Sequence, residues 1–448
     1  MIIKKIRISN LHGQHENKEI EFNEKLTFLY GSNGCGKTTV LNILAAIVTG
    51  KLYNLCDYKF DKIELFFLKQ NNKEEKIVVE IVLDEENKRL FRINIDNKKY
   101  IIDDIDNLKE RMYRMTEDEN IDKTFFDMYP FLKNIVNKFN YVYLPLNRYG
   151  YDSGEERDYY RFGFSRRRYY EMHSNTYNSY LNESLRYISE LIKDNCVNIN
   201  IQENAVNNQF RRDVLSSMIH VSSDMPIGKF INEISHFKWE EVLKSKDAYI
   251  KTLKEIGVYD NNLKREIETY FKAFKDAYDD YVRQKNNDKE RTRISIDLAW
   301  QYTEFQKIKS IAEIAMKTEK IKEEIRHPKI LFEELINDFF ESSGTHKRVK
   351  ITNEGEVIFK TRGDNLLLKD LSSGEKQIVI TFASLIFGLK GDGTGIFIVD
   401  EPEASLHLEW QNKFVPAILK TNIKLQLIFA THSPELIGKY RNNAVRLK

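Results

Sequence analysis

Residues 31–38 read Gly-Ser-Asn-Gly-Cys-Gly-Lys-Thr and match the pattern GxxxxGK[ST]. An apolar run, Leu26 to Tyr30, enters this stretch, and the apolar residues of a helix, Val40 to Val48, follow it. Glycines let the backbone fold so that successive N–H groups and the start of the helix point at negative charge. The stretch therefore predicts a phosphate-binding loop between a buried strand and a helix, and with it an α/β fold.

The side chains at the end of this loop predict its ligands. The ammonium group of Lys37 is placed to neutralise the β and γ phosphates of ATP, and the Thr38 hydroxyl to hold Mg²⁺. We therefore expect ATP and Mg²⁺ as the cofactors. The expected nucleotide-binding residues of the loop are Ser32, Asn33, Gly34, Cys35, Gly36, Lys37, Thr38 and Thr39.

A second segment, Ile396 to Glu401, consists of four apolar residues followed by two carboxylates. Such a run is typical of a strand that is buried on both faces. We expect Asp400 to support Mg²⁺, usually through a water molecule, and Glu401 to orient and polarise the water that attacks the γ-phosphate. The pattern is weak alone. Together with the loop at 31–38 it predicts an ATP-hydrolysing site, with Glu401 as a catalytic residue and with Thr38 and Asp400 as metal ligands.

A third segment, Leu371 to Glu375, reads Leu-Ser-Ser-Gly-Glu and precedes an apolar run, Ile378 to Leu389, that predicts a buried helix. The segment has two interpretations. Its hydroxyl and N–H groups form a second anion-binding device at a helix start, or they form only an N-terminal helix cap. The expected binding residues are Ser372, Ser373, Gly374 and Glu375.

A fourth segment, Thr431-His432-Ser433-Pro434, follows another apolar run, Leu425 to Ala430, that predicts a strand. The imidazole of His432 either contacts the γ-phosphate or has a structural role. We expect the first, with His432 as a catalytic residue.

The region after the loop predicts β structure. Apolar segments separated by Asn, Lys and Glu clusters are typical of an antiparallel meander. The expected strands are Ile63 to Leu68, Ile77 to Leu83 and Leu90 to Ile95.

Residues 226–328 predict a helical insertion, because apolar residues recur there at helical spacing and proline is absent between the two ends. Within it, segments 239–284 and 294–325 form either an antiparallel coiled-coil hairpin or an ordinary helical subdomain. A separate helix is expected at 330–340, after Pro328.

Composition limits the partners and the compartment. Among the 448 residues, 70 Lys and Arg stand against 68 Asp and Glu, so net charge gives no general argument for a nucleic-acid or membrane partner. The cysteines at positions 35, 56 and 196 show no metal-binding or disulfide spacing. No segment approaches the roughly 18 continuous apolar residues of a membrane-spanning helix. We therefore expect a cytoplasmic protein without a membrane partner.

The ordered set of four motifs resembles the ATP-binding-cassette (ABC) ATPases, over residues 1–50 and 328–448. Within that superfamily, the spelling Asp-Glu-Pro-Glu-Ala-Ser-Leu-His at 400–407 is similar to the branch that includes RecF, SMC and overcoming-lysogenization-defect (OLD) proteins. The long interval between Lys37 and Leu371 exceeds that of transporter ATPases and suits this branch, which inserts helical arms there.

The resemblance implies an α/β fold class: an ABC-ATPase head, with a P-loop mixed sheet and an antiparallel β subdomain, plus a long helical insertion. It places the N-terminal half of the head at residues 1–150, the helical insertion at 151–327 and the C-terminal half of the head at 328–448.

It also implies a homo-oligomer, at least a dimer, in which ATP lies between the loop of one subunit and residues 372–375 of the other. Ser372 and Gly374 would contact the γ-phosphate across the interface, and His432 would take the switch-histidine position. The Q-loop glutamine of the family has only a weak candidate, Gln70.

In architecture the chain resembles the stand-alone ATPase subunits of bacterial anti-phage systems such as PARIS (AriA) and Septu (PtuA), which work with a separately encoded effector nuclease. This resemblance implies an ATPase that acts as the sensor or regulatory scaffold of such a system. Its expected partners are a second copy of itself and an effector such as a Toprim or HNH nuclease, with nucleic acid or a phage protein as an open alternative.

Two other functions stay open. Arg157 to Tyr170 interleaves five arginines with six aromatic residues, and it either binds nucleic acid or an acidic partner, or packs as an ordinary loop. Direct DNA binding would favour a DNA repair or recombination ATPase of the RecF or SMC kind. In the last alternative the protein is itself the effector nuclease, although the helical insertion shows no HNH, Toprim or PD-(D/E)xK cluster.

Overall fold

The computed structural model describes residues 1–14, 17–69, 71–102, 104–114, 121–144, 152–153, 176–219, 232–233, 236–256, 258–287, 294–389, 395–421 and 424–447. The chain divides into two compact units. Unit 1 comprises Met1–Cys196 and Pro328–Lys448, and unit 2 comprises Val197–His327.

The two units meet at 196/197 and 327/328. The expected division of the chain at 150/151 and 327/328 stays a prediction. Helix α6 (Thr176–Ile219) begins in unit 1, and its first described part belongs to the core of that unit. Its buried residues there are Leu185, Tyr187, Ile188, Ile192 and Cys196.

A six-stranded sheet forms the centre of unit 1, in the order β15-β3-β14-β13-β8-β9. Its strands are β15 (Ala444–Arg446), β3 (Leu26–Tyr30), β14 (Leu425–Thr431), β13 (Gly395–Asp400), β8 (Tyr141–Leu144) and β9 (Asp152–Ser153). The first five strands are parallel, and β9 is antiparallel to β8. Tyr30, Thr431 and Asp400 therefore end their strands at the same edge of the sheet.

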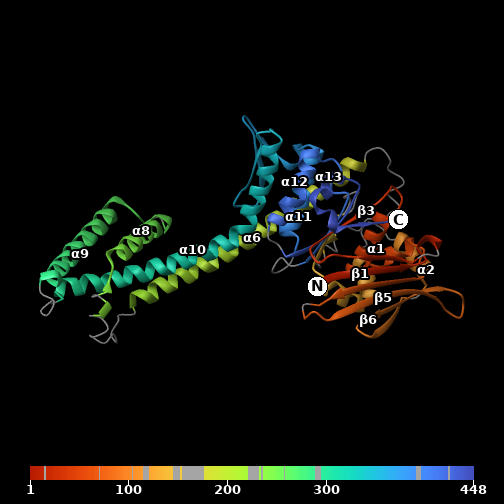
Figure 1. The fold of residues 1–448 in the computed structure, drawn as a ribbon, viewed down its shortest axis with the longest axis horizontal. Coiled ribbons are helices and arrows are strands. Elements are labelled where there is room, and N and C mark those ends of the chain that lie inside the picture. The colour runs from red at the N-terminus through yellow and green to blue at the C-terminus, as the bar shows by residue number, and fades with distance from the viewer. Residues whose placement is uncertain are drawn as a thin grey trace. The chain divides into compact units, whose positions relative to one another are not determined.

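Both faces of this sheet are buried, which explains the continuous apolar runs of its strands. Ile396 and Ile398 of β13 pack in a core with α1 (Lys37–Val48), while Phe397 and Val399 pack in a second core with α11 (Ser373–Phe387) and α12 (Leu408–Lys420). Figure 1 shows α11, α12 and α13 (Pro434–Ile437) on the other side of β3 from α1. The expected strands and buried helix are confirmed.

An antiparallel sheet has the order β2-β1-β4-β5-β6-β7 and packs its inner face on the α1 core. Its strands are β1 (Ile2–Ser9), β2 (Lys18–Glu21), β4 (Lys62–Leu68), β5 (Glu74–Leu83), β6 (Arg89–Ile95) and β7 (Lys98–Ile102). The expected meander corresponds to β4, β5 and β6 and is confirmed. Helices α2 (Ile105–Arg114), α3 (Ile121–Met128) and α4 (Lys133–Val136), which the sequence reading did not assign, contribute to the same core.

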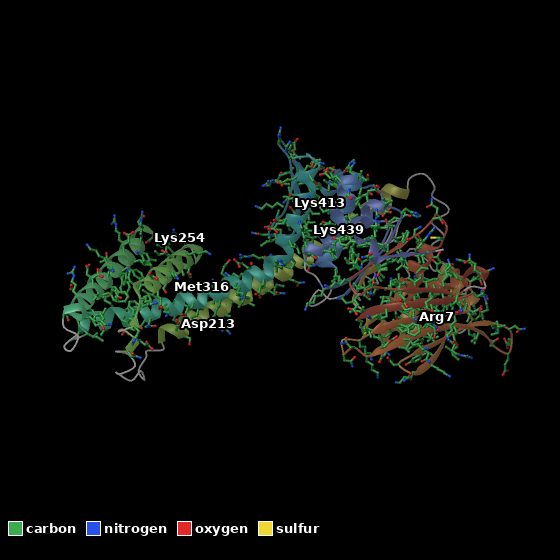
Figure 2. The ribbon with its side chains drawn as sticks, viewed as in Figure 1. Arg7, Asp213, Lys254, Met316, Lys413 and Lys439 are labelled. Carbon is green, nitrogen blue, oxygen red and sulfur yellow. The ribbon has the colours of Figure 1, made fainter. Side chains whose placement is uncertain are left out.

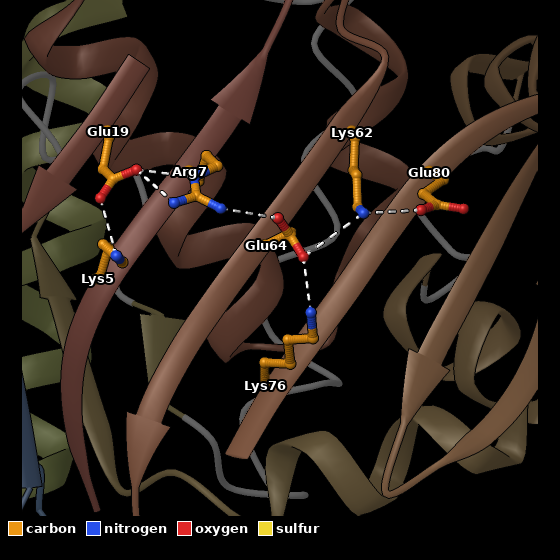
Figure 3. Close-up of polar contacts among 7 residues, drawn as sticks. All are labelled: Lys5, Arg7, Glu19, Lys62, Glu64, Lys76 and Glu80. Carbon is orange, nitrogen blue, oxygen red and sulfur yellow. Dashed lines mark hydrogen bonds and ion pairs between the residues drawn. The ribbon is translucent and has the colours of Figure 1, made fainter. Parts of the chain in front are cut away.

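The outer face of the antiparallel sheet carries a ladder of cross-strand ion pairs (Figure 3). Glu64 of β4 lies 3.6 Å from Arg7 of β1 and 2.9 Å from Lys76 of β5, and Lys62 of its own strand lies 3.5 Å away. Each half-exposed pair adds at most about 1 kcal/mol to stability, but opposite charges on neighbouring strands favour this register over a shifted one.

Three short strands, β10 (Arg348–Ile351), β11 (Val357–Lys360) and β12 (Asn365–Leu366), form a third sheet. The first of them is hydrogen-bonded to α10 (Ile296–Ser342), because Asn337 donates to the Val349 carbonyl at 3.2 Å and accepts from its N–H at 2.7 Å. Lys413 of α12, labelled in Figure 2, lies 2.8 Å from Asp338 of α10.

Unit 2 is helical. Its core is formed by α8 (Trp239–Ile256), α9 (Asn261–Asn287) and α10. The expected continuous segment 239–284 is instead two helices, and the Asp260 carboxylate caps the second by accepting from the Leu263 N–H at 2.7 Å. Helices α6 and α10 are joined within this unit by the ion pair between Glu203 and Arg326.

The expected separate helix at 330–340 is wrong, because α10 continues through Pro328 without interruption. Proline inside a helix costs roughly 3 kcal/mol. Contacts beyond it offset this cost: Lys329 donates to the Thr352 carbonyl at 3.0 Å, and Phe332 and Ile336 are fully buried. Among the described helices, none combines the length and the apolar character needed to cross a membrane.

Candidate nucleotide site

The loop at 31–36 connects β3 to α1, as the sequence predicts. Gly34 and Gly36 have φ angles of 80° and 91°, in the left-handed region that favours glycine. A side chain at Gly31 would lie 2.6 Å from the Leu447 carbonyl oxygen and 2.8 Å from Cys35 Sγ. The loop conformation therefore requires glycine at these three positions.

Lys37 is buried, whereas the loop tip at 32–34 is exposed. Its ammonium group donates to the carbonyl oxygens of Gly31 at 3.2 Å and Ser32 at 3.3 Å. It also lies 3.5 Å from Nδ1 of His432, at the end of β14. Cys35, Gly36, Thr38 and Thr39 are half-buried.

Asp400 ends β13 with a fully buried side chain. Neither of its carboxylate oxygens has a hydrogen-bond partner among the described residues. Burial raises the pKa of Asp400 to about 6, helped by the nearby charges of Glu401 and Glu403 and opposed by Thr38 and Lys37. The Thr38 hydroxyl is thus close enough to favour the ionised form, although its geometry falls short of a hydrogen bond.

These two side chains fit a magnesium ion. A buried carboxylate without a partner is costly unless a cation or a donor meets it. Mg²⁺ prefers oxygen ligands and is usually held by one or two protein oxygens together with water and phosphate. Asp400 and Thr38 supply such oxygens beside the phosphate-binding loop.

Glu401 follows directly and has a φ angle of 45°, which is uncommon for a residue with a side chain. Its N–H donates to the Ala430 carbonyl at 2.8 Å, which ties the end of β13 to β14. Its Oε1 lies 3.6 Å from Nε2 of His432, an ion-pair distance when the imidazole is protonated. The imidazole therefore lies between Lys37 and Glu401.

The segment at 372–375 is a helix cap. Ser372 Oγ accepts from the Glu375 N–H at 3.4 Å, and the Glu375 carboxylate accepts from the Ser372 N–H at 2.8 Å. Glu375 is buried and paired with Lys347, whereas Ser372 and Ser373 are exposed. Within the described residues, no hydrogen bond or ion pair joins this segment to the loop at 31–38.

Gly374 is buried against the segment that follows the Asp-Glu pair. A side chain there would lie 2.5 Å from the Ser405 carbonyl oxygen. Close by, Gln377 donates to the Pro402 carbonyl at 2.6 Å. Residues 372–375 and 402–408 are therefore neighbours on one surface.

Two residues with a place in the site were missed by the sequence reading. Glu403 accepts hydrogen bonds from Thr431 and from the backbone of His432. Lys18 of β2 donates to the Cys35 carbonyl at 3.0 Å. Glu403 belongs to the Asp-Glu-Pro-Glu motif, so the sequence could have identified it. Lys18 lies in a strand without a motif, so the sequence could not. Gln70 and Arg157 to Tyr170 lie outside the described residues.

Comparison with curated proteins finds relatives that match short segments of this chain. The chain is 33% identical over 90 residues to "Retron Ec83 probable ATPase" of Escherichia coli, covering 18% of this chain and 17% of the relative. It is 30% identical over 93 residues to "Septu protein PtuA" of Bacillus thuringiensis, covering 18% and 24%. The matches thus span a quarter or less of these relatives' length. The second match confirms the expected resemblance to Septu PtuA.

Comparison with solved structures finds SMC heads. The Smc head domain with an extended coiled coil from Pyrococcus furiosus aligns with a TM-score of 0.41 and 10% identity, over 100% of this chain and 94% of that chain. The SMC head domain from Thermotoga maritima aligns with a TM-score of 0.37 and 11% identity, over 98% and 91%.

A family comparison covers most of the chain. The AAA_15 family, described as an AAA ATPase domain, matches residues 1–437, a range that includes the loop, the Asp-Glu pair and His432. This protein therefore belongs to the AAA_15 family of ATPase domains.

Proposed function

We propose that this chain binds and hydrolyses Mg-ATP and uses that cycle as the regulatory subunit of an anti-phage system with a separate effector nuclease. One observation carries the enzymatic part. Lys37, His432 and Glu401 form a continuous series of contacts at 3.5 and 3.6 Å, at the sheet edge where the buried Asp400 also lies.

The loop and Lys37 bind the phosphates. The N–H groups of the loop and the N-terminus of α1 supply positive potential. Lys37 then exchanges the carbonyl oxygens of Gly31 and Ser32 for the β and γ phosphates, which offer full negative charge. Thr38 and Asp400 would hold Mg²⁺, which supplies charge neutralisation of the phosphates.

Glu401 orients the attacking water and accepts its proton. Its position at the end of β13 is set by the bond from its N–H to Ala430. The His432 imidazole lies 3.6 Å from the Glu401 carboxylate and 3.5 Å from Lys37, so it is placed to contact the γ-phosphate beside Lys37.

A second copy completes the site. The exposed hydroxyls of Ser372 and Ser373 stand at the start of α11, where backbone N–H groups favour an anion. In the proposed dimer they contact the γ-phosphate bound to the other copy. Because both copies then bind the same phosphate, ATP favours the closed dimer, which is the differential affinity that a switch needs.

The regulatory role rests on the similarity to Septu PtuA and to the retron ATPase. The partner we propose is a separately encoded nuclease of the Toprim or HNH type. The relatives' aligned segments are short, so this part is tested independently of the ATPase chemistry.

The ATPase proposal is tested with purified protein. Wild type is expected to bind and turn over Mg-ATP. Lys37→Ala should abolish binding, and Glu401→Gln should keep binding while lowering kcat by about 10² to 10⁴. Lys25→Ala, an exposed lysine at the other end of β3, is the matched control. Absence of Mg-ATP binding by the wild type would refute the proposal.

The regulatory role is tested by co-expressing this chain with the products of the genes that flank its own and measuring phage plating. Protection that disappears in Glu401→Gln supports the proposal. Turnover that is stimulated by DNA alone, together with unchanged plating in every combination, contradicts it and points to a DNA repair ATPase.

A further inference from the structure

We propose that Glu403 is a positioning residue, whose carboxylate holds the backbone at 431–433 so that the His432 imidazole stays between Lys37 and Glu401. This inference rests on the proposed function and assigns the residue that fixes the geometry of that site.

A single oxygen of Glu403 accepts three hydrogen bonds. Oε1 accepts from the Thr431 hydroxyl at 2.7 Å, from the His432 N–H at 2.7 Å and from the Ser433 N–H at 3.2 Å. Hydrogen bonds to an ionised acceptor are stronger than neutral ones. One carboxylate oxygen therefore holds three consecutive residues at the end of β14.

The Glu403 carboxylate lies after β13, the strand that ends in Asp400. Glu403 follows the Asp400-Glu401 pair at the end of β13, so its carboxylate joins the ends of two adjacent parallel strands. The Thr431 side chain, which makes one of the bonds, is itself fully buried. A shift of either strand end would therefore change the separation of His432 from Glu401.

A second connection, through Gln411, restrains the same loop. Ser433 Oγ lies 2.8 Å from Gln411 Oε1, and Gln411 Nε2 donates to the Leu406 carbonyl at 2.9 Å. The segment 402–408 consequently holds the loop both directly, through Glu403, and through α12.

The backbone bonds matter because the imidazole itself is weakly restrained. A third of the His432 side chain is exposed, and its contacts to Lys37 and Glu401 are 3.5 and 3.6 Å long. Contacts of this length do not fix a ring, so its position depends on where the backbone at 432 is held. Small displacements of a catalytic group have large effects on rate.

Three variants separate the roles of the carboxylate. Glu403→Ala removes the acceptor for all three donors. Glu403→Gln keeps an amide oxygen that can accept them but removes the charge. Glu409→Ala removes an exposed carboxylate of the neighbouring α12 and is the matched control.

The first measurement does not need turnover. Protein labelled at histidine ¹³Cε1 gives signals for nine histidines, and His432→Ala assigns the one of interest. Glu403→Ala should shift or broaden the His432 signal and leave the others in place, whereas Glu403→Gln and Glu409→Ala should resemble wild type. An unchanged His432 signal in Glu403→Ala would overturn the proposal. If that variant does not fold, Thr431→Val is judged by the same two results; it removes the 2.7 Å bond to Glu403 and the 2.9 Å bond that the Thr431 hydroxyl accepts from the Ser433 N–H.

The second measurement is a double-mutant cycle on ATP turnover. Glu403→Ala should lower kcat by about tenfold with KM within about twofold, and Glu403→Gln should recover most of the loss. In the His432→Ala background, Glu403→Ala should add nothing further, because it acts through that residue. If the losses in kcat caused by the two substitutions multiply in the double variant, the proposal is overturned. Absence of any wild-type turnover would instead refute the proposed function, while the histidine signal would still decide the role of Glu403.

Discussion

The ammonium nitrogen of Lys347 lies 2.8 Å from Oε1 and 3.0 Å from Oε2 of Glu375. The Glu375 side chain is only 4% exposed, and the same carboxylate closes the capping box with Ser372. Burial opposes ionisation, but the bonds from Lys347 and Ser372 outweigh it and lower the pKa of Glu375. The residue just before β10 is therefore tied to the start of α11.

Replacing Lys347 with methionine should destabilise unit 1 by about 1 to 3 kcal/mol, because a buried carboxylate loses its cation. Urea unfolding measures the loss, and Lys350→Met, on the exposed side of β10, is the control. Because the folded-state pKa of Glu375 is lowered, the loss should be complete above pH 4.5 and shrink as the pH falls below it. Equal effects of the two substitutions would show that the pair is not stabilising.

Gly374→Ala should destabilise the protein by about 1 to 3 kcal/mol, because the new methyl group would lie 2.5 Å from the Ser405 carbonyl oxygen. Alanine favours a helix over glycine, so any loss reports packing alone. Gly363→Ala is the control, since nothing lies within 4 Å of a side chain there. Thermal unfolding of both variants checks the prediction, and an unchanged Gly374→Ala protein would contradict it.

Stability without nucleotide should fall between pH 3.8 and about 6 because of Asp400. The folded protein binds this proton more tightly than the unfolded chain, so the contribution is greatest below pH 3.8 and is lost as the pH rises to about 6. The full loss is at most about 3 kcal/mol. Asp400→Asn should become more stable relative to wild type over that range, as measured by urea unfolding at several pH values. Parallel profiles for the two proteins would refute the prediction.

Lys18→Ala should weaken Mg-ATP binding by about threefold to tenfold, because the Cys35 carbonyl loses its 3.0 Å bond and the phosphate-binding loop gains freedom. Isothermal titration calorimetry measures the affinity. Lys4→Ala, whose ion pair joins Glu24 instead, should bind like wild type. If both variants bind alike, the Lys18 contact does not order the loop.

The sequence by itself determined the parts of this protein that depend on neighbours in the chain. The loop at 31–38 needs glycines at fixed spacing before a helix, and β13 needs a continuous apolar run before Asp400-Glu401, so short patterns sufficed. The cap formed by Ser372 and Glu375 follows from local geometry in the same way.

Only the tertiary structure decided which distant residues complete the site. Lys18 contacts the loop from β2, a strand of the other, antiparallel sheet, and no local pattern predicts such a contact. Glu403 contacts the backbone of His432 because β13 and β14 are adjacent in the central sheet. The raised pKa of Asp400 likewise requires burial on all sides. Helix α10 also depends on tertiary contacts. Proline disfavours a helix locally, so the sequence predicts a break at Pro328, but the packing of the residues after it offsets that cost and the helix continues.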